Sequence, residues 1–197
     1  NQKRKLDTET FEVAFPYLID KDGVYYLGYN PSSNISLVVL NNADPNTFRS
    51  FLSAMYGSYG KDKNFVWYKD KLLSEADAKT FQFKDPHGID NNHIFMEGIV
   101  VEDADPKTYK RLFEYFSDNK NIYFKGQKVI GADKNTFVDL KNFYARDANN
   151  VYYFGKVLQN ADLATFKVDE FYGYETNTAR DKNYEYQFGK ILRPITE

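Results

Sequence analysis

Residues 147–166 read DANNVYYFGKVLQNADLATF, and this stretch decides the fold. It contains a turn, an aromatic strand, a glycine turn and an aliphatic strand, followed by Ala-Asp-x-x-Thr-Phe. The same order recurs at residues 118–137 and 90–109, more loosely at 62–81, and with a longer middle at 20–48. A sixth copy opens at Asp181 and stops. The chain is therefore a tandem repeat.

The spacing of the copies predicts how the chain is organised. The turn aspartates stand at positions 20, 62, 90, 118, 147 and 181, so the three central steps are 28, 28 and 29 residues. A nearly fixed step is typical of supersecondary units that stack as an array. At 197 residues we expect one repeat domain over residues 1–197, with units starting near 20, 62, 90, 118 and 147 and a partial capping unit from 181.

Composition and turn chemistry predict a mainly β fold. Aromatic residues make up 18% of the chain, a bias that favours pleated, half-buried strands. Asp and Asn suit the first turn because their side chains bond nearby backbone groups. Glycine suits the second because it adopts the left-handed conformation, and the candidates are Gly28, Gly98, Gly126, Gly155 and Gly189. We predict stacked units of about 28 residues, each with three antiparallel strands.

Each unit is also predicted to contain one short helical turn at Ala-Asp-x-x-Thr. The Asp caps such a turn, and at residues 43–47 and 104–108 a Pro follows it at the first helical position. The apolar residues of 109–116 also fit an amphipathic helix. The sequence leaves that alternative open.

Alternation along the aromatic strand separates two faces. One face carries an aliphatic column that we expect in the core, formed by Val24, Val66, Ile94, Ile122 and Val151. The other carries the aromatic column, which we expect to be half buried at most and which consists of Tyr25, Trp67, Phe95, Tyr123, Tyr152 and Tyr186. Such a row of rings could hold a sugar chain or an extended peptide, so these six are the candidate ligand-binding residues. The alternative is that they pack on adjoining strands.

The sixth copy differs in polarity. Its core-face positions hold Glu185 and Gln187, as expected for a terminal unit with no neighbour on one side. We therefore interpret it as a cap.

Charge and composition argue against several classes of protein. The net charge of -2 gives no field that would attract nucleic acid, and no window is apolar enough to predict a transmembrane segment. The absence of cysteine excludes disulfides and thiolate zinc sites. Asp20-Lys-Asp-Gly23 offers oxygen ligands, but a calcium loop needs about six or seven, so we expect structural turns, no metal and no cofactor. His87 and His93 lack a third ligand at zinc spacing, and no nucleophile or phosphate-loop motif predicts catalytic residues.

With the units laid out, the turns resemble a known signature. Asp62-Lys-Asn64, Asp181-Lys-Asn-Tyr184 and Asp147-Ala-Asn-Asn-Val-Tyr-Tyr153 resemble the DKNYY repeat family of bacterial proteins, over roughly residues 20–193. That family's function is uncharacterised, and its members are commonly exported or at the cell surface. The resemblance thus implies an envelope location, and it supplies no catalytic or binding residues.

We expect a non-enzymatic, exported β-repeat module that binds a protein or a glycan. A repeat-scaffold hydrolase using Asp or Glu pairs from neighbouring units, and a purely structural spacer, are the alternatives. A hydrolase would need polar residues that break the repeat in one place. The spacing predicts neither the oligomeric state nor the ligand.

Overall fold

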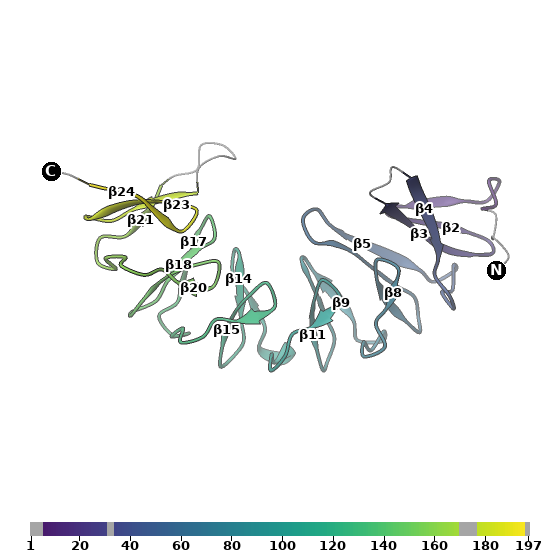
Figure 1. Cartoon of the computed structure of the whole chain (residues 1–197). Helices are drawn as coiled ribbons and strands as arrows, with labels where there is room; N and C mark the ends of the chain where they lie inside the picture. Colours follow the sequence, from purple (N-terminus) through teal and green to yellow (C-terminus); the bar gives the residue numbers. More distant parts are fainter. Residues whose placement is uncertain (1–5, 31–33, 170–176, 196–197) are drawn as a thin grey trace. The chain divides into compact units, whose positions relative to one another are not determined.

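The computed structural model describes residues 6–30, 34–169 and 177–195 (Figure 1). It is mainly β, as predicted, and six four-stranded antiparallel sheets follow one another along the chain. The chain divides into two compact units, Asn1–Val101 with sheets 1 to 3 and Glu102–Glu197 with sheets 4 to 6. The single domain expected from the sequence stays a prediction.

The first unit contains strands β1 to β12. Sheet 1 comprises β1 (Glu12–Ala14), β2 (Tyr17–Asp20), β3 (Gly23–Asn30) and β4 (Asn34–Val39). Sheet 2 comprises β5 (Arg49–Ser53), β6 (Gly57–Lys61), β7 (Val66–Tyr68) and β8 (Lys71–Leu72). Sheet 3 comprises β9 (Gln82–Lys84), β10 (His87–Ile89), β11 (Ile94–Met96) and β12 (Ile99–Val100).

The second unit contains strands β13 to β24. Sheet 4 comprises β13 (Lys110–Arg111), β14 (Tyr115–Ser117), β15 (Ile122–Phe124) and β16 (Gln127–Lys128). Sheet 5 comprises β17 (Val138–Lys141), β18 (Tyr144–Arg146), β19 (Val151–Tyr153) and β20 (Lys156–Val157). Sheet 6 comprises β21 (Lys167–Val168), β22 (Thr178–Arg180), β23 (Tyr184–Gln187) and β24 (Lys190–Pro194). In every sheet the strands pair in chain order.

A sheet has four strands where the sequence predicted three per unit. The turn Asp does not begin a sheet but joins its second and third strands, as Asp147 does between β18 and β19. The first two strands come from residues after the Thr-Phe of the preceding copy. For the same reason sheet 6 is complete, because β21 and β22 precede the turn at Asp181.

The glycine turns form as predicted in four of the five expected places. Gly98, Gly126, Gly155 and Gly189 have φ between 68° and 76°, and the residue before each also has positive φ. A two-residue hairpin loop with a type I′ turn requires two successive residues with positive φ. Gly28 is the exception, because β3 continues through it and pairs it with Ser36. Sheet 1 therefore has a longer hairpin than the other sheets.

The Asp-x-x-Thr turns are short. Among the described residues the one helix is the 3-10 helix η1 (Pro106–Thr108), where the Asp105 side chain accepts from the N–H of Lys107. In four other copies the Thr N–H donates to the Asp carbonyl three residues earlier at 3.2 Å, which closes a single turn. The alternative of an amphipathic helix over 109–116 is wrong, because β13 and β14 occupy that segment.

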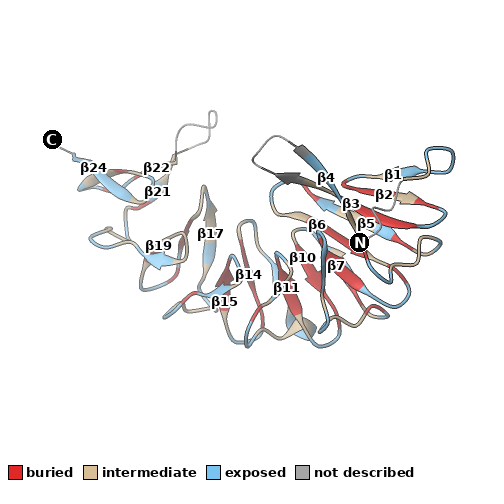
Figure 2. Cartoon of the chain, turned by 45° about the vertical axis from the view of Figure 1, so that its right-hand side comes forward, coloured by how far each residue is buried: buried red, intermediate tan, exposed pale blue. Residues whose placement is uncertain are grey.

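The core lies between the sheets of each unit. All five members of the aliphatic column are buried, at 0–2% exposed, as predicted. Figure 2 shows the buried residues concentrated on the central strands. The ends of the strands and the turns are more exposed.

Candidate binding site

The aromatic column is buried, so the expectation that it is half buried at most is wrong. Each of its six rings is 0–1% exposed; they are Tyr25, Trp67, Phe95, Tyr123, Tyr152 and Tyr186. The physical reason is that the connection leading into each sheet lies against the ring: the hydroxyls of Tyr123, Tyr152 and Tyr186 donate to the carbonyls of Asp103, Gly131 and Asn160, at 3.1, 3.4 and 3.3 Å. Ligand contact by these rings was inferred from their exposure, and this burial removes the basis for it.

Four rings of the column, namely Trp67, Phe95, Tyr152 and Tyr186, belong to three-ring groups that connect neighbouring sheets. In the second unit Phe166 lies 5.6 Å from Tyr144 of sheet 5 and 5.7 Å from Tyr186 of sheet 6, between ring centroids. In the first unit Phe48 lies in the same way between Tyr17 and Trp67, at 5.0 and 5.8 Å. Such tilted pairs stabilise by about 0.5–1.5 kcal/mol beyond burial. The Phe of Thr-Phe thus joins one sheet to the next.

The turn aspartates are structural acceptors. Asp147 accepts from the N–H groups of Asn149 and Asn150 on one oxygen, at 2.7 and 2.8 Å. Its other oxygen accepts from the N–H of Asp133 at 2.8 Å and the hydroxyl of Tyr152 at 2.7 Å. Burial alone raises the pKa of Asp147, but these four donors outweigh it and lower the pKa below its usual value. The turn chemistry explains these residues without a cation.

No group of three or more His, Asp or Glu side chains in the described part of the chain is placed to hold a metal ion. His87 is buried at 4% exposed. It stands three residues before a turn Asp, at the start of β10. That position is occupied by a tyrosine in four of the other five sheets.

Those tyrosines were missed in the sequence, and they bridge adjacent sheets. Tyr144 donates its hydroxyl to the carbonyl of Asn177 at 3.2 Å and accepts from the N–H of Gly189 at 3.0 Å. Tyr59 and Tyr115 make the same two kinds of bond, and Tyr17 donates to the carbonyl of Lys69. The available signal was their fixed position three residues before the turn Asp.

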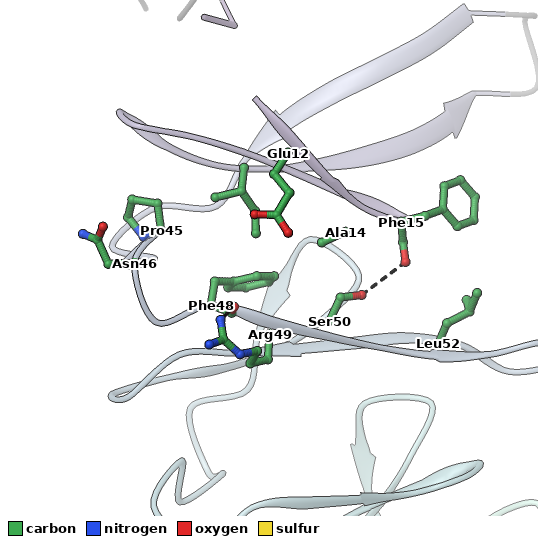
Figure 3. Close-up of a pocket in the computed structure, with 10 residues that line it drawn as sticks. Glu12, Ala14, Phe15, Pro45, Asn46, Phe48, Arg49, Ser50 and Leu52 are labelled. Atoms are coloured by element: carbon green, nitrogen blue, oxygen red, sulfur yellow. Dashed lines mark hydrogen bonds between the residues drawn. The ribbon is translucent and has the colours of Figure 1, made fainter. Parts of the chain in front are cut away.

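A cleft in the first unit is the best candidate for ligand contact. It lies between β1 and β5, the first strands of sheets 1 and 2, and has a volume of about 710 Å³ (Figure 3). Pro45 and Asn46 lie at one end, and Phe15 and Leu52 at the other. Ser50 donates to the carbonyl of Phe15 at 3.2 Å and so links the two strands.

The cleft combines planar polar groups with apolar surface. Figure 3 shows the Glu12 carboxylate directed from β1 toward the strand that carries Arg49. Both side chains are exposed, and no ion pair joins them within the described chain. One guanidinium nitrogen of Arg49 donates to the carbonyl of Phe48 at 2.8 Å. This bond orients the guanidinium group and leaves its other N–H donors available. At the far end the Phe15 ring is 62% exposed.

A smaller cleft occupies the equivalent place in the second unit. Its volume is about 360 Å³, and its lining includes Lys110 of β13, Leu112 just after it, and Lys134 and Asn135 of the next Asp-x-x-Thr turn. Lys110 stands two residues after a Thr, as Glu12 and Arg49 do. The cleft is therefore a feature of the repeat, with different charges in different copies.

One carboxylate pair interrupts the repeat. Burial, and then the charge of Asp139, raises the pKa of Glu114 to about 7. Asp139 accepts from the N–H groups of Glu114 and Tyr115, at 2.6 and 3.2 Å. Nearby, three successive residues, 141–143, have positive φ. Two acids from neighbouring sheets are the kind of pair that the hydrolase alternative needs, but backbone donors already occupy one oxygen of Asp139.

The model of the DKNYY family matches residues 1–71 and 59–190, two overlapping ranges that fit a repeat family. The chain belongs to the DKNYY family. Searches of curated proteins and of solved structures gave no match to this DKNYY-family protein. In its described part, no helix has both the length and the hydrophobicity to cross a lipid bilayer.

Proposed function

We propose that this DKNYY-family protein is a non-enzymatic, exported bacterial module that binds a glycan in the cleft between β1 and β5. The observation that carries the proposal is the combination of the Glu12 carboxylate and the Arg49 guanidinium with the exposed ring of Phe15. Sugar hydroxyls both donate and accept, so they fit an acceptor and a donor that face one space. The C–H face of a sugar ring fits against a phenyl ring.

A glycan suits the cleft better than an apolar ligand. Four lining side chains are polar, namely Glu12, Asn46, Arg49 and Ser50, and Phe15 and Leu52 are confined to one end. An apolar ligand would displace water from the exposed side chains of Glu12, Asn46 and Arg49 without replacing its hydrogen bonds, at a cost of about 1–3 kcal/mol for each group left unpaired. Export is proposed from the family resemblance, and finding the protein in envelope or medium fractions of the producing bacterium would test it.

The binding test uses a panel of bacterial envelope glycans and, in parallel, extended peptides. We expect a glycan to bind, and Arg49→Ala and Glu12→Gln each to weaken it about tenfold, equal to about 1.4 kcal/mol. Lys71→Ala on β8 is the matched control and should leave affinity unchanged. Peptide binding without glycan binding would contradict the ligand class. Unchanged affinity in both cleft variants would contradict the site.

The hydrolase alternative has its own test. If the Glu114–Asp139 pair is catalytic, the protein turns over a glycan and Glu114→Gln abolishes that turnover. We expect no turnover in the wild-type chain. A structural spacer would bind no member of the panel.

A further inference from the structure

Strand β4 is an edge strand with an unusual composition. It forms one edge of sheet 1, and no described strand pairs with its outer side. Proteins usually protect such edges by keeping them short or by placing charges on them. The sequence of β4 is NISLVV, six residues with no charge. Every other described edge strand longer than two residues carries a charge: Glu12 in β1, Arg49 in β5, Lys84 in β9, Asp139 in β17 and Arg193 in β24.

The outward hydrogen-bonding groups of β4 follow from its register. Leu40 donates its N–H to the carbonyl of Val24 at 2.8 Å, so the backbone N–H and C=O groups of Leu40 face β3. In an antiparallel ladder alternate residues face the partner strand. The N–H and C=O groups of Ile35, Leu37 and Val39 therefore point away from the sheet. They are available to another strand.

The same three residues also present apolar side chains on one face. Ile35 is 73% exposed and Leu37 is 47% exposed, while Val39 is partly exposed. Figure 2 shows exposed colouring on the described part of β4. A strand that paired here would gain backbone hydrogen bonds and cover apolar surface at once.

We propose that β4 pairs antiparallel with β4 of a second copy of this chain, across a two-fold axis at Leu37. In that register Leu37 lies opposite its own counterpart, and Ile35 lies opposite the counterpart of Val39. A two-fold interface brings identical patches together, so a lysine or glutamate at or beside position 37 would lie close to its own like-charged counterpart. An uncharged strand avoids this repulsion, which favours a second copy as the occupant.

The pairing leaves the proposed glycan site free. β1 and β4 form opposite edges of sheet 1, so a β4 dimer leaves the cleft at β1 uncovered. The dimer would present two clefts, and a polymeric ligand could engage both with higher avidity than one. The dimer does not depend on the identity of the ligand.

The first test measures mass in solution by sedimentation and light scattering. At about 100 µM we expect twice the 23.0 kDa of one chain, as an interface with a micromolar dissociation constant would give. Leu37→Lys should return the mass to that of one chain. Leu52→Lys is the control, because Leu52 is 51% exposed on β5 and should leave the dimer intact. A monomeric wild-type chain at this concentration overturns the proposal, as does a dimeric Leu37→Lys variant.

A second measurement, hydrogen exchange, begins with the wild-type chain. In the wild-type chain we expect the amides of Ile35, Leu37 and Val39 to exchange about sevenfold more slowly at 100 µM than at 1 µM, because a dissociation constant of about 1 µM lowers the monomer fraction by that factor. Leu37→Pro should remove this dependence at the other two amides, because it deletes an outward donor and no bond to β3. Exchange that is independent of concentration overturns β4 as the interface, even if a dimer forms elsewhere.

Discussion

The tyrosine bridges yield a sharp prediction for Tyr144→Phe. The substitution keeps the ring, which is 0% exposed, and removes one oxygen. That oxygen accepts from Gly189 and donates to Asn177, so both backbone groups lose a partner. A buried unpaired group costs about 1–3 kcal/mol, and both sites are partly buried, so water can compensate in part. We expect the free energy of unfolding of the second unit to fall by about 1–3 kcal/mol.

Urea unfolding, followed by tyrosine fluorescence and circular dichroism, measures the effect. With a slope of about 1–3 kcal/mol/M, the midpoint should fall by about 1 M. Tyr184→Phe is the control in the same unit, because no hydrogen bond joins the Tyr184 hydroxyl to another residue of the described ranges, while its ring contacts Tyr186. If Tyr144→Phe lies within about 0.5 kcal/mol of both the wild type and this control, the bridge does not stabilise the stack and the reasoning fails.

Three further predictions address other parts of the second unit. Gly189→Ala combines a φ of 68° with a new Cβ that would overlap the Tyr153 ring, so the free energy of unfolding should fall by about 2–4 kcal/mol in thermal unfolding. Gly131→Ala is the control, because Gly131 has a φ of 78° but lies in open space, and this substitution should lower the free energy of unfolding by only about 1 kcal/mol. Equal losses would contradict the packing argument. The Glu114 pKa is raised in the folded state, so wild-type stability should fall as pH rises from 4.5 to 7, by about 1–2 kcal/mol after solvent screening. Glu114→Gln should abolish that fall, and a variant with the same pH profile as wild type would refute it. Asp147→Ala leaves four donors without their acceptor and should lower the free energy of unfolding by about 3 kcal/mol in urea at pH 7. Because the pKa of Asp147 is lowered in the folded state, the difference in stability between wild type and variant should shrink as pH falls below about 4. A difference that stays constant down to pH 2 would argue against an ionised acceptor.

Local features of the fold could be predicted from the sequence because each has a local cause. The left-handed conformation at Gly98 and Gly155 follows from the absence of a Cβ, and the turn at Asp147 follows from side chain to backbone hydrogen bonds. The aliphatic column follows from alternation. In each case residues within about five positions decide the outcome.

Features that depend on neighbouring sheets could not be predicted in the same way. Tyr152 alternates with core residues and so was expected at a half-exposed face, but a stacked sheet is covered on both faces. Gly28 satisfies the turn spacing, yet β3 continues through it because pairing with β4 extends to Asn34. The cleft between β1 and β5 was invisible for the same reason, since Glu12 and Arg49 are 37 positions apart.

The repeat separates the residues that hold the stack from those that can contact a ligand. The turn Asp is buried in all six sheets, and its bonds recur from copy to copy. The position two residues after the Thr is exposed in all six, and it changes in charge and size: Glu12, Arg49, Gln82, Lys110, Val138 and Lys167. An exposed side chain at the start of a first strand contributes little to stability. The chemistry of a cleft can therefore change from one copy to the next while the Asp, Thr and aromatic residues maintain the same scaffold.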